Sequence, residues 1–465
     1  MTSITRNQDK LRRSISTSQA VGIAFNQVVG GGVVSLTGVA IALTGGGAPI
    51  AYLMAALSII IVSIPYAAIG SAMPVTGGGY TYLSRFVHPL AGYLNMCFST
   101  LSQTSMALYG IVAGQYMHSL NPWFDPTTVA FSMISFFYVA NMLGAVIGAR
   151  LSTIMMLLHI AGFAVFIVYG FWNIDWVHYP PLLPNGLPKL FQAAAVLTFA
   201  CGGALTVIEL GGELKHPGRA IPMAIFGGTL LAAALYVAIA IVAAGILPIP
   251  QVANQPLSVV AAHFLPPAAL QFFILGGAII AVIGSTNSQL LAGSKSLLAA
   301  VDDGWFPKRL GSVNRRFGTP HFLLTLLYVV GVVPVLFHIP LEMIASAVSA
   351  MIQMMFSLVI IAALRFRYLR PDLHDAAPFK LNLGVQWLLS ILGVGVCCVQ
   401  TYLLLSEGAI GKLLPIFLTA SAVMIAWGAI RYAHVRRTAT LFADDRTQAR
   451  GISPSGPDLE ATVSI

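Results

Sequence analysis

Charged residues are scarce in this sequence. Asp, Glu, Lys and Arg make up only 8% of its 465 residues, while hydrophobic residues make up 57%, and the mean hydropathy is +0.84. A water-soluble domain needs much more polar surface than this composition can supply. The sequence therefore excludes a soluble globular domain and predicts a protein that crosses the lipid bilayer several times.

Other absences exclude further classes of protein. The sequence has no Walker-type G-x-x-x-x-G-K-[ST] motif, which argues against ATP-driven transport. It has no cluster of His, Asp and Glu with the spacing of metal ligands or of a nucleophile and its base, so we expect no enzyme, no catalytic residues, no cofactor and no metal. The few cysteines lie in apolar segments without zinc-type spacing and are expected to be packing residues: Cys97, Cys201, Cys397 and Cys398.

The formal net charge of +9 does not indicate a nucleic-acid partner. The basic residues stand singly between apolar segments and do not form the continuous basic patch that nucleic acids require. The first 19 residues are polar and contain no apolar core of a secretory signal. We therefore expect the first apolar segment to direct insertion into the membrane.

Apolar segments of about twenty residues, long enough to cross a bilayer, recur twelve times. They are residues 20–43, 48–72, 88–118, 127–148, 151–171, 187–213, 221–247, 267–300, 320–338, 342–366, 383–405 and 413–431. With a cytoplasmic N-terminus, every Lys and Arg except Lys189 and Lys412 falls on the cytoplasmic side. The positive-inside rule therefore predicts that both termini are cytoplasmic.

This pattern predicts three parts. Residues 1–19 form a cytoplasmic tail, residues 20–434 form the membrane domain, and residues 435–465 form a second cytoplasmic tail without apolar periodicity, which we expect to be disordered. The membrane is predicted to be the plasma (inner) membrane of a prokaryote.

Two of the apolar segments contain glycines where an uninterrupted helix would be expected. Gly30, Gly31 and Gly32 interrupt the first, and the stretch from Cys201 to Gly203 interrupts the sixth. Glycine disfavours a continuous helix, and backbone at bilayer depth leaves the helical pattern only where protein or a cavity satisfies its polar groups. Because five spans separate the two breaks, the halves are predicted to be inverted repeats with a binding site between them. The alternative is that these glycines only permit close helix packing.

Four stretches resemble one family. Residues 29–34 resemble the motif I-G-S-G-I-F, residues 74–80 resemble P-x-x-G-G-x-Y, and residues 199–222 resemble F-A-Y-S-G-F-E followed by E-x-K-N-P-x-R-x-I-P. The fourth stretch comprises residues 285–287, 303–307 and 318–320. The sequence is similar in this way to the amino acid, polyamine and organocation permeases. The resemblance implies an all-α, leucine-transporter-type fold of twelve transmembrane helices. Two inverted five-helix repeats, at about 20–171 and 187–366, would precede two extra helices within 383–431, and helices 1 and 6 would be broken.

The resemblance also implies a function. We expect a secondary active transporter that moves amino acids or related amines by alternating access, with proton-coupled uptake. The alternatives are a sodium-coupled symporter, an amino acid or polyamine exchanger and a non-transporting sensor. The substrate is expected between the breaks, where helix-terminal N–H groups favour a carboxylate and carbonyl groups favour an ammonium. The predicted binding residues are Val29, Gly30, Gly31, Gly32, Phe199, Ala200, Cys201, Gly202, Ala204 and Leu205.

The sequence departs from the family pattern in the sixth segment. Ala204 and Leu205 stand where many members have an aromatic gate and a glutamate. This departure implies either a larger ligand or a gate supplied by another part of the chain.

A few polar residues at membrane depth are candidates for ion coupling. His159 occupies the position where many proton-coupled relatives carry a lysine that faces the first span, and Glu209 is the second candidate for the proton. Each has an alternative, since a histidine can be neutral and hydrogen-bonded within the bundle, and Glu209 could bind a substrate amine or pair with a base. Ser285 and Thr286 are the alternative sodium ligands, because hydroxyl oxygens suit a hard cation. The predicted cytoplasmic gate residues are Arg85, Glu213, Lys215 and Lys295.

Overall fold

The computed structural model describes residues 15–143, 146–314, 317–406 and 414–438. Within these ranges the chain is helical, and its only β-type pairings are two isolated bridges, Ile15 with Leu214 and Thr76 with Leu210. The predicted all-α class is confirmed for this part of the chain. Most of the two predicted tails, residues 1–14 and 439–465, lies outside the described residues.

The helices follow the predicted segments closely. In the first half they are α1 (Thr17–Val28), α2 (Gly31–Thr44), α3 (Ala48–Ala72), α4 (Gly78–Phe86), α5 (Pro89–Leu101), α6 (Ser105–Leu120), α7 (Pro126–Met142) and α8 (Val146–Phe171), with 3₁₀ turns η2 (Gly45–Gly47) and η3 (Ser102–Thr104). The short helix α4 was not predicted as a separate element. Its N-cap, Gly77, has a φ of +66°, a left-handed conformation that glycine adopts without strain.

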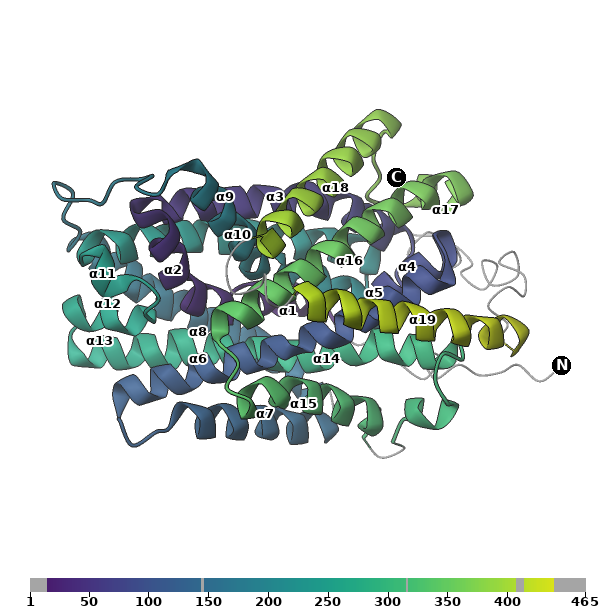
Figure 1. The fold of residues 1–465 in the computed structure, drawn as a ribbon, viewed down its shortest axis with the longest axis horizontal. Helices are drawn as coiled ribbons and strands as arrows, with labels where there is room; N and C mark the ends of the chain where they lie inside the picture. The colour runs from purple at the N-terminus through teal and green to yellow at the C-terminus, as the bar shows by residue number, and fades with distance from the viewer. Residues whose placement is uncertain (1–14, 144–145, 315–316, 407–413, 439–465) are drawn as a thin grey trace, which may run out of the picture.

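The second half begins with the other interrupted segment. Its elements are α9 (Gly186–Cys201), η4 (Gly202–Glu209), η5 (Gly211–Glu213), α10 (Pro217–Ile246), α11 (Ile249–Val252), α12 (Leu257–Phe264), α13 (Pro267–Phe272), the π-helix η6 (Phe273–Ile279), α14 (Ile280–Asp302), η7 (Lys308–Gly311), α15 (His321–Leu336), α16 (Leu341–Leu369), α17 (Pro371–Ala376), α18 (Leu383–Ser406) and α19 (Leu414–Thr438). The long helices run side by side, with α11 and α12 at one end of the bundle and α4 and α17 at the other (Figure 1).

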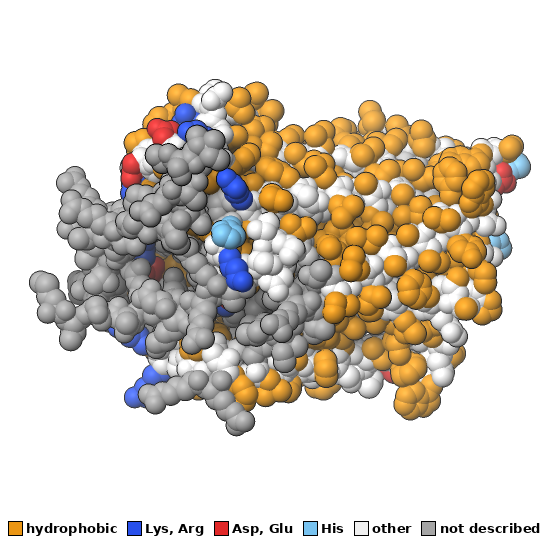
Figure 2. Space-filling model, turned by 180° about the vertical axis from the view of Figure 1, so that it is seen from behind, with side chains coloured by type: hydrophobic (Ala, Val, Ile, Leu, Met, Phe, Trp, Pro, Cys, Tyr) orange, Lys and Arg blue, Asp and Glu red, His pale blue; other side chains and the backbone are white. Residues whose placement is uncertain are grey.

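The described helices include seven that are long and apolar enough to cross a membrane. Large apolar side chains point outward along the bundle, for example Phe136 at 66% exposure and Ile391 at 64%. Hydrophobic side chains cover much of the surface in Figure 2, while Lys and Arg gather at one end. The chain is therefore an integral multi-pass membrane protein. The count of twelve spans and the inverted repeat stay predictions.

Local sequence signals fix where the central helices begin. Ser16 caps α1 by accepting a hydrogen bond from the backbone N–H of Gln19, whose side chain accepts one from the backbone of Ser16 in return. Pro217 occupies the first turn of α10, where a missing N–H costs nothing. Helix α10 packs extensively against α1 and α3, so these three elements form the frame around the first break.

Candidate functional site

The first span is broken between α1 and α2, as predicted. Helix α1 ends at Val28 and α2 begins at Gly31, with Gly30 in a non-helical conformation (φ −126°, ψ −144°). Two of the carbonyl groups at the end of α1 accept hydrogen bonds from side chains of other spans. The Ser285 hydroxyl donates to the Asn26 carbonyl at 3.0 Å, and the Tyr236 hydroxyl donates to the Val28 carbonyl. The break is thus stabilised within the protein, as backbone at membrane depth requires.

The sixth span changes from an α-helix to a 3₁₀-helix at the predicted position. Helix α9 ends at Cys201, and η4 continues for eight residues to Glu209. A 3₁₀ run of this length is uncommon, because its hydrogen-bond geometry is poorer than that of an α-helix. The sixth span therefore contains a long non-α-helical segment in the middle of a buried region.

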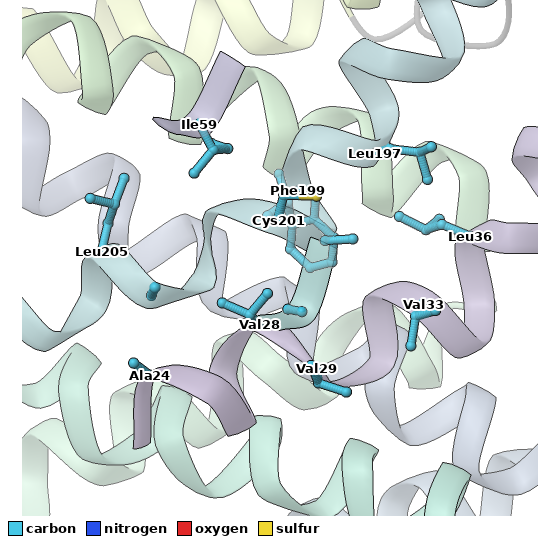
Figure 3. Close-up of a cluster of buried hydrophobic side chains, with 14 of the residues drawn as sticks. Ala24, Val28, Val29, Val33, Leu36, Ile59, Leu197, Phe199, Cys201 and Leu205 are labelled. Carbon is cyan, nitrogen blue, oxygen red and sulfur yellow. The ribbon is translucent and has the colours of Figure 1, made fainter. Parts of the chain in front are cut away.

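The two breaks contact each other directly. A Cβ atom built at Gly203 would lie 2.2 Å from the Gln27 carbonyl oxygen, and one built at Gly32 would lie 2.6 Å from the Ala200 Cβ. Figure 3 shows Val28 of α1 close to Phe199 and Cys201 of α9. Glycine at these two positions permits a backbone approach that any other residue would prevent.

The structure places the predicted binding residues around this crossing. A Cβ at Gly30 would overlap the Ser285 hydroxyl, and one at Gly31 would lie 2.2 Å from the Tyr109 ring. Val29, Ala200, Cys201 and Ala204 are buried in the same core. The first-turn N–H groups of α2 and the C-terminal carbonyls of α9 therefore lie in the same region of the bundle, since helix ends leave these groups without intrahelical partners.

A cavity of about 100 Å³ lies beside the second break. It is lined by three of the predicted binding residues, Phe199, Gly202 and Leu205, and by Glu209. Sequence reasoning missed most of its polar lining, which comes from α1, α5, η3 and α14: Gln27, Asn95, Ser99, Ser102, Gln103 and Gln289. The available signal was the presence of amide side chains inside apolar segments, since polar groups at membrane depth are costly unless they serve a purpose.

Glu209 lines this cavity. Its carboxylate accepts hydrogen bonds from the backbone N–H of Gly79 at 3.0 Å and from the Ser296 hydroxyl at 2.6 Å. Its backbone carbonyl accepts a further bond from the N–H of Gly77 at 3.0 Å. Glu209 therefore links η4 to α4 and α14.

His159 is fully buried on α8, which packs against α1. A Cβ built at Gly284 on α14 would lie 3.4 Å from the Asn26 side chain and 3.5 Å from the His159 ring. The ring therefore faces the end of α1 next to the break. The backbone of Ile280 on α14 lies close enough to interact with the ring, an arrangement that also fits the alternative of a hydrogen-bonded structural histidine.

The two hydroxyl residues of α14 have different partners. Ser285 bonds to the Asn26 carbonyl of α1, while the Thr286 hydroxyl donates to the Val282 carbonyl of its own helix at 3.0 Å. Both side chains are completely buried. Ser285 therefore contacts the first break, and Thr286 makes the ordinary side-chain bond of a helical threonine.

Two buried ion pairs lie at one end of the bundle. We call this end, which holds Arg85, Glu213, Lys295 and Asp303, the charged end. Arg85 pairs with Asp303 at 2.9 Å, and Lys295 pairs with Glu213 at 2.7 Å. The pairs join α4 to the C-terminal end of α14, and α14 to η5. Three of the four predicted gate residues are therefore paired.

Lys215, the fourth predicted gate residue, has an exposed side chain. Its backbone N–H donates to the Ile15 carbonyl at 2.9 Å, and the Ile15 N–H donates to the Glu213 carbonyl at 3.0 Å. The segment before α1 is thus tied to the segment that follows the second break.

Comparison with known proteins matches this sequence to one group of transporters. The profile of the family described as "Amino acid permease" matches residues 15–430. The chain belongs to this amino acid permease family. It is therefore a membrane permease and not an enzyme.

Individual relatives of this permease carry different substrates. It is 25% identical over 403 residues to the Branched-chain amino acid permease BcaP of Bacillus subtilis, covering 80% of this chain and 84% of the relative. It is 26% identical over 325 residues to the Serine/threonine exchanger SteT of the same species, covering 67% and 73%. It is 24% identical over 410 residues to the Methylthioribose transporter of that species, covering 83% and 87%.

Proposed function

We propose that this permease is a secondary active transporter of amino acids or related amines that works by alternating access around the crossing of its two broken spans. The proposal rests on the contact between the two breaks, in which Gly203 packs against the Gln27 backbone and Gly32 packs against Ala200. This contact sets the donor end of α2 and the acceptor end of α9 together. A zwitterion needs both signs of dipole at once when it leaves water.

The remaining predictions complete the proposal. The fold would be twelve spans, with inverted repeats over residues 20–171 and 187–366. The charged end and both termini would lie on the cytoplasmic side of the plasma membrane of a prokaryote. The basic side chains that gather at this end support that orientation (Figure 2). Arg85, Glu213 and Lys295 would form the cytoplasmic gate. The substrate would contact residues 29–32, 199–202, 204 and 205 around the crossing.

Uptake tests the transporter proposal directly. The purified full-length protein in proteoliposomes is expected to accumulate at least one amine-bearing solute from a radiolabelled panel of amino acids and polyamines. The imposed pH or sodium gradient that drives accumulation identifies the coupling ion. Failure of uptake and of exchange for every solute would contradict the transporter proposal and favour a sensor on the same fold.

Proton coupling is the favoured mode, with His159 as its first candidate and Glu209 as its second. The His159 ring is buried beside the end of α1. A charge at such a position is costly, so a proton taken up there would favour a state in which the ring reaches water or an acceptor. Sodium is the alternative ion, with Ser285 at the first break and Thr286 beside it as ligands.

Replacement of His159 by alanine is expected to abolish accumulation driven by a pH gradient, while exchange of labelled for unlabelled substrate across the membrane continues. Gradient-driven uptake and counterflow in the same proteoliposomes measure the two processes. His263→Ala, at an exposed position on α12, is the matched control and should behave as wild type. Unchanged proton-driven uptake in His159→Ala would remove His159 from the coupling mechanism.

A further inference from the structure

The cavity beside the second break holds several amide groups whose polar atoms lack partners. Asn95 is 0% exposed and Gln103 is 2% exposed. Both polar side-chain atoms of Asn95, the Oε1 atom of Gln103 and the Oε1 atom of Gln27 form no hydrogen bond to a described residue. Burying a polar atom without a partner costs free energy, so this wall of the cavity is suited to receive a polar group.

Two glycines create the space for these amides. A Cβ at Gly293 would lie 2.7 Å from the Gln103 amide nitrogen, and one at Gly79 would lie 3.1 Å from the Asn95 amide nitrogen and 2.9 Å from a Glu209 carboxylate oxygen. The polar wall is therefore part of the close packing of α4, α5 and α14.

The sign of the expected ligand follows from the ionisable residues. Amide groups can turn either a donor or an acceptor toward a ligand, so they do not select charge. Among the described residues that line the cavity, Glu209 is the only one with an ionisable acid, and none is Lys, Arg or His. Its two hydrogen bonds from Gly79 and Ser296 leave further lone pairs, since an ionised carboxylate accepts about four bonds.

The length of the expected ligand follows from the 3₁₀-helix. Glu209 lies six residues after Gly203, which at about 2.0 Å per residue places it roughly 12 Å along η4 from the crossing of the breaks. Apolar side chains, Phe199 among them, also line the cavity. At about 10–15 Å³ for each water, the cavity has room for roughly seven or more waters. A ligand held at the crossing therefore reaches Glu209 only through a long, mainly aliphatic side chain.

We propose that this cavity is the side-chain subsite of the transporter and that it selects substrates with a long side chain ending in a cation, an ammonium or a guanidinium group. The inference rests on the proposed transport function and assigns Glu209 to substrate recognition. Asn95, Gln103 and Gln27 supply acceptors for the remaining N–H donors of the cation. A substrate with a short or wholly apolar side chain leaves the carboxylate and these amides without a ligand partner. A site whose buried polar groups would stay unpaired discriminates strongly against such a substrate.

Lysine and norleucine form a matched pair of probes, because they differ only in the terminal ammonium group. Competition against the transported label in proteoliposomes should give lysine an inhibition constant at least about tenfold below that of norleucine, the effect of one charged hydrogen bond. Glu209→Gln should remove this difference and leave norleucine affinity intact, since glutamine can keep the bond from Gly79 and pair with Ser296. Asn95→Asp should enlarge the difference by adding a second carboxylate.

Different outcomes separate the two proposals. If no amino acid or amine binds or is transported, the transport function itself fails. If norleucine or leucine is transported as well as lysine, if glutamine is preferred to lysine, or if Glu209→Gln keeps the wild-type ratio, only the cationic subsite fails. Should Glu209→Gln lose affinity for both probes, Asn95→Asp decides: an unchanged ratio in that variant overturns the assignment, and an increased ratio supports it.

Discussion

Gly203→Ala is expected to abolish substrate binding and transport. The added Cβ would lie 2.2 Å from the Gln27 carbonyl oxygen, 2.4 Å from its carbon and 2.8 Å from the Val28 nitrogen. All three are backbone atoms at the end of α1, so no side-chain rotation relieves the overlap. The two breaks must move apart, and a displacement of about 1 Å at a site of this kind can cost on the order of a hundredfold in rate.

Two other glycines provide controls for this prediction. A Cβ at Gly202 meets only the ends of the Ile59 and Phe356 side chains at 3.3 Å, and one at Gly227 meets nothing within 4 Å. Gly202→Ala should therefore be milder than Gly203→Ala, and Gly227→Ala should bind as wild type. Ligand affinity and uptake are measured together with the thermal stability of the ligand-free protein. Wild-type affinity in Gly203→Ala would show that the crossing does not position the substrate.

The two breaks could be predicted from the sequence because their signal is local. Three consecutive glycines inside an apolar span, and a Cys-Gly-Gly stretch inside another, disfavour a continuous helix whatever surrounds them. The structure confirms the interruptions between Val28 and Gly31 and after Cys201. It also shows which glycines touch the other break, Gly32 and Gly203, a distinction that depends on how two distant helices cross.

The polar wall of the cavity could not be predicted in the same way. Asn95 and Gln103 lie on the consecutive elements α5 and η3, whereas Gln289 lies far away in the sequence on α14, and each residue alone is compatible with an ordinary buried amide. Only the packing of α5, η3 and α14 around η4 brings them into one cavity. Sequence spacing indicates the face of a helix on which a residue lies, but it does not indicate which face of another helix that residue meets.

The gate residues show the same limit. The sequence places Arg85, Glu213 and Lys295 near the rim of the membrane but does not assign their partners. The structure supplies the pairs, Arg85 with Asp303 and Lys295 with Glu213, and it leaves the Lys215 side chain exposed. Position relative to the membrane follows from hydropathy, whereas pairing follows from tertiary packing.

Lys295→Met is expected to destabilise closure of the charged end. The Lys295 and Glu213 side chains are only 7% and 11% exposed, so removing the ammonium leaves a nearly buried carboxylate without its partner. Breaking a buried ion pair in this way costs about 3–5 kcal/mol. Where the alternative state exposes Glu213 to water, this cost shifts the balance toward the open state by roughly a hundredfold to several thousandfold.

Cysteine accessibility measures this shift. In a background without the native cysteines, Ser99→Cys places a thiol in the cavity wall. Its reaction with a membrane-impermeant reagent, added from the side of the charged end, should be much faster when Lys295→Met is also present. Lys308→Met makes the same replacement at an exposed position near the same end and should leave the reaction rate unchanged.

The double variant Glu213→Gln with Lys295→Met isolates the physical cause. It removes the stranded carboxylate and replaces it with a neutral amide, so the closed state should recover and thiol modification should slow toward the wild-type rate. Recovery identifies the unpaired charge, not the lost lysine packing, as the source of opening. Equal modification rates in the single and double variants, or no acceleration in Lys295→Met, would show that this ion pair does not hold the charged end closed.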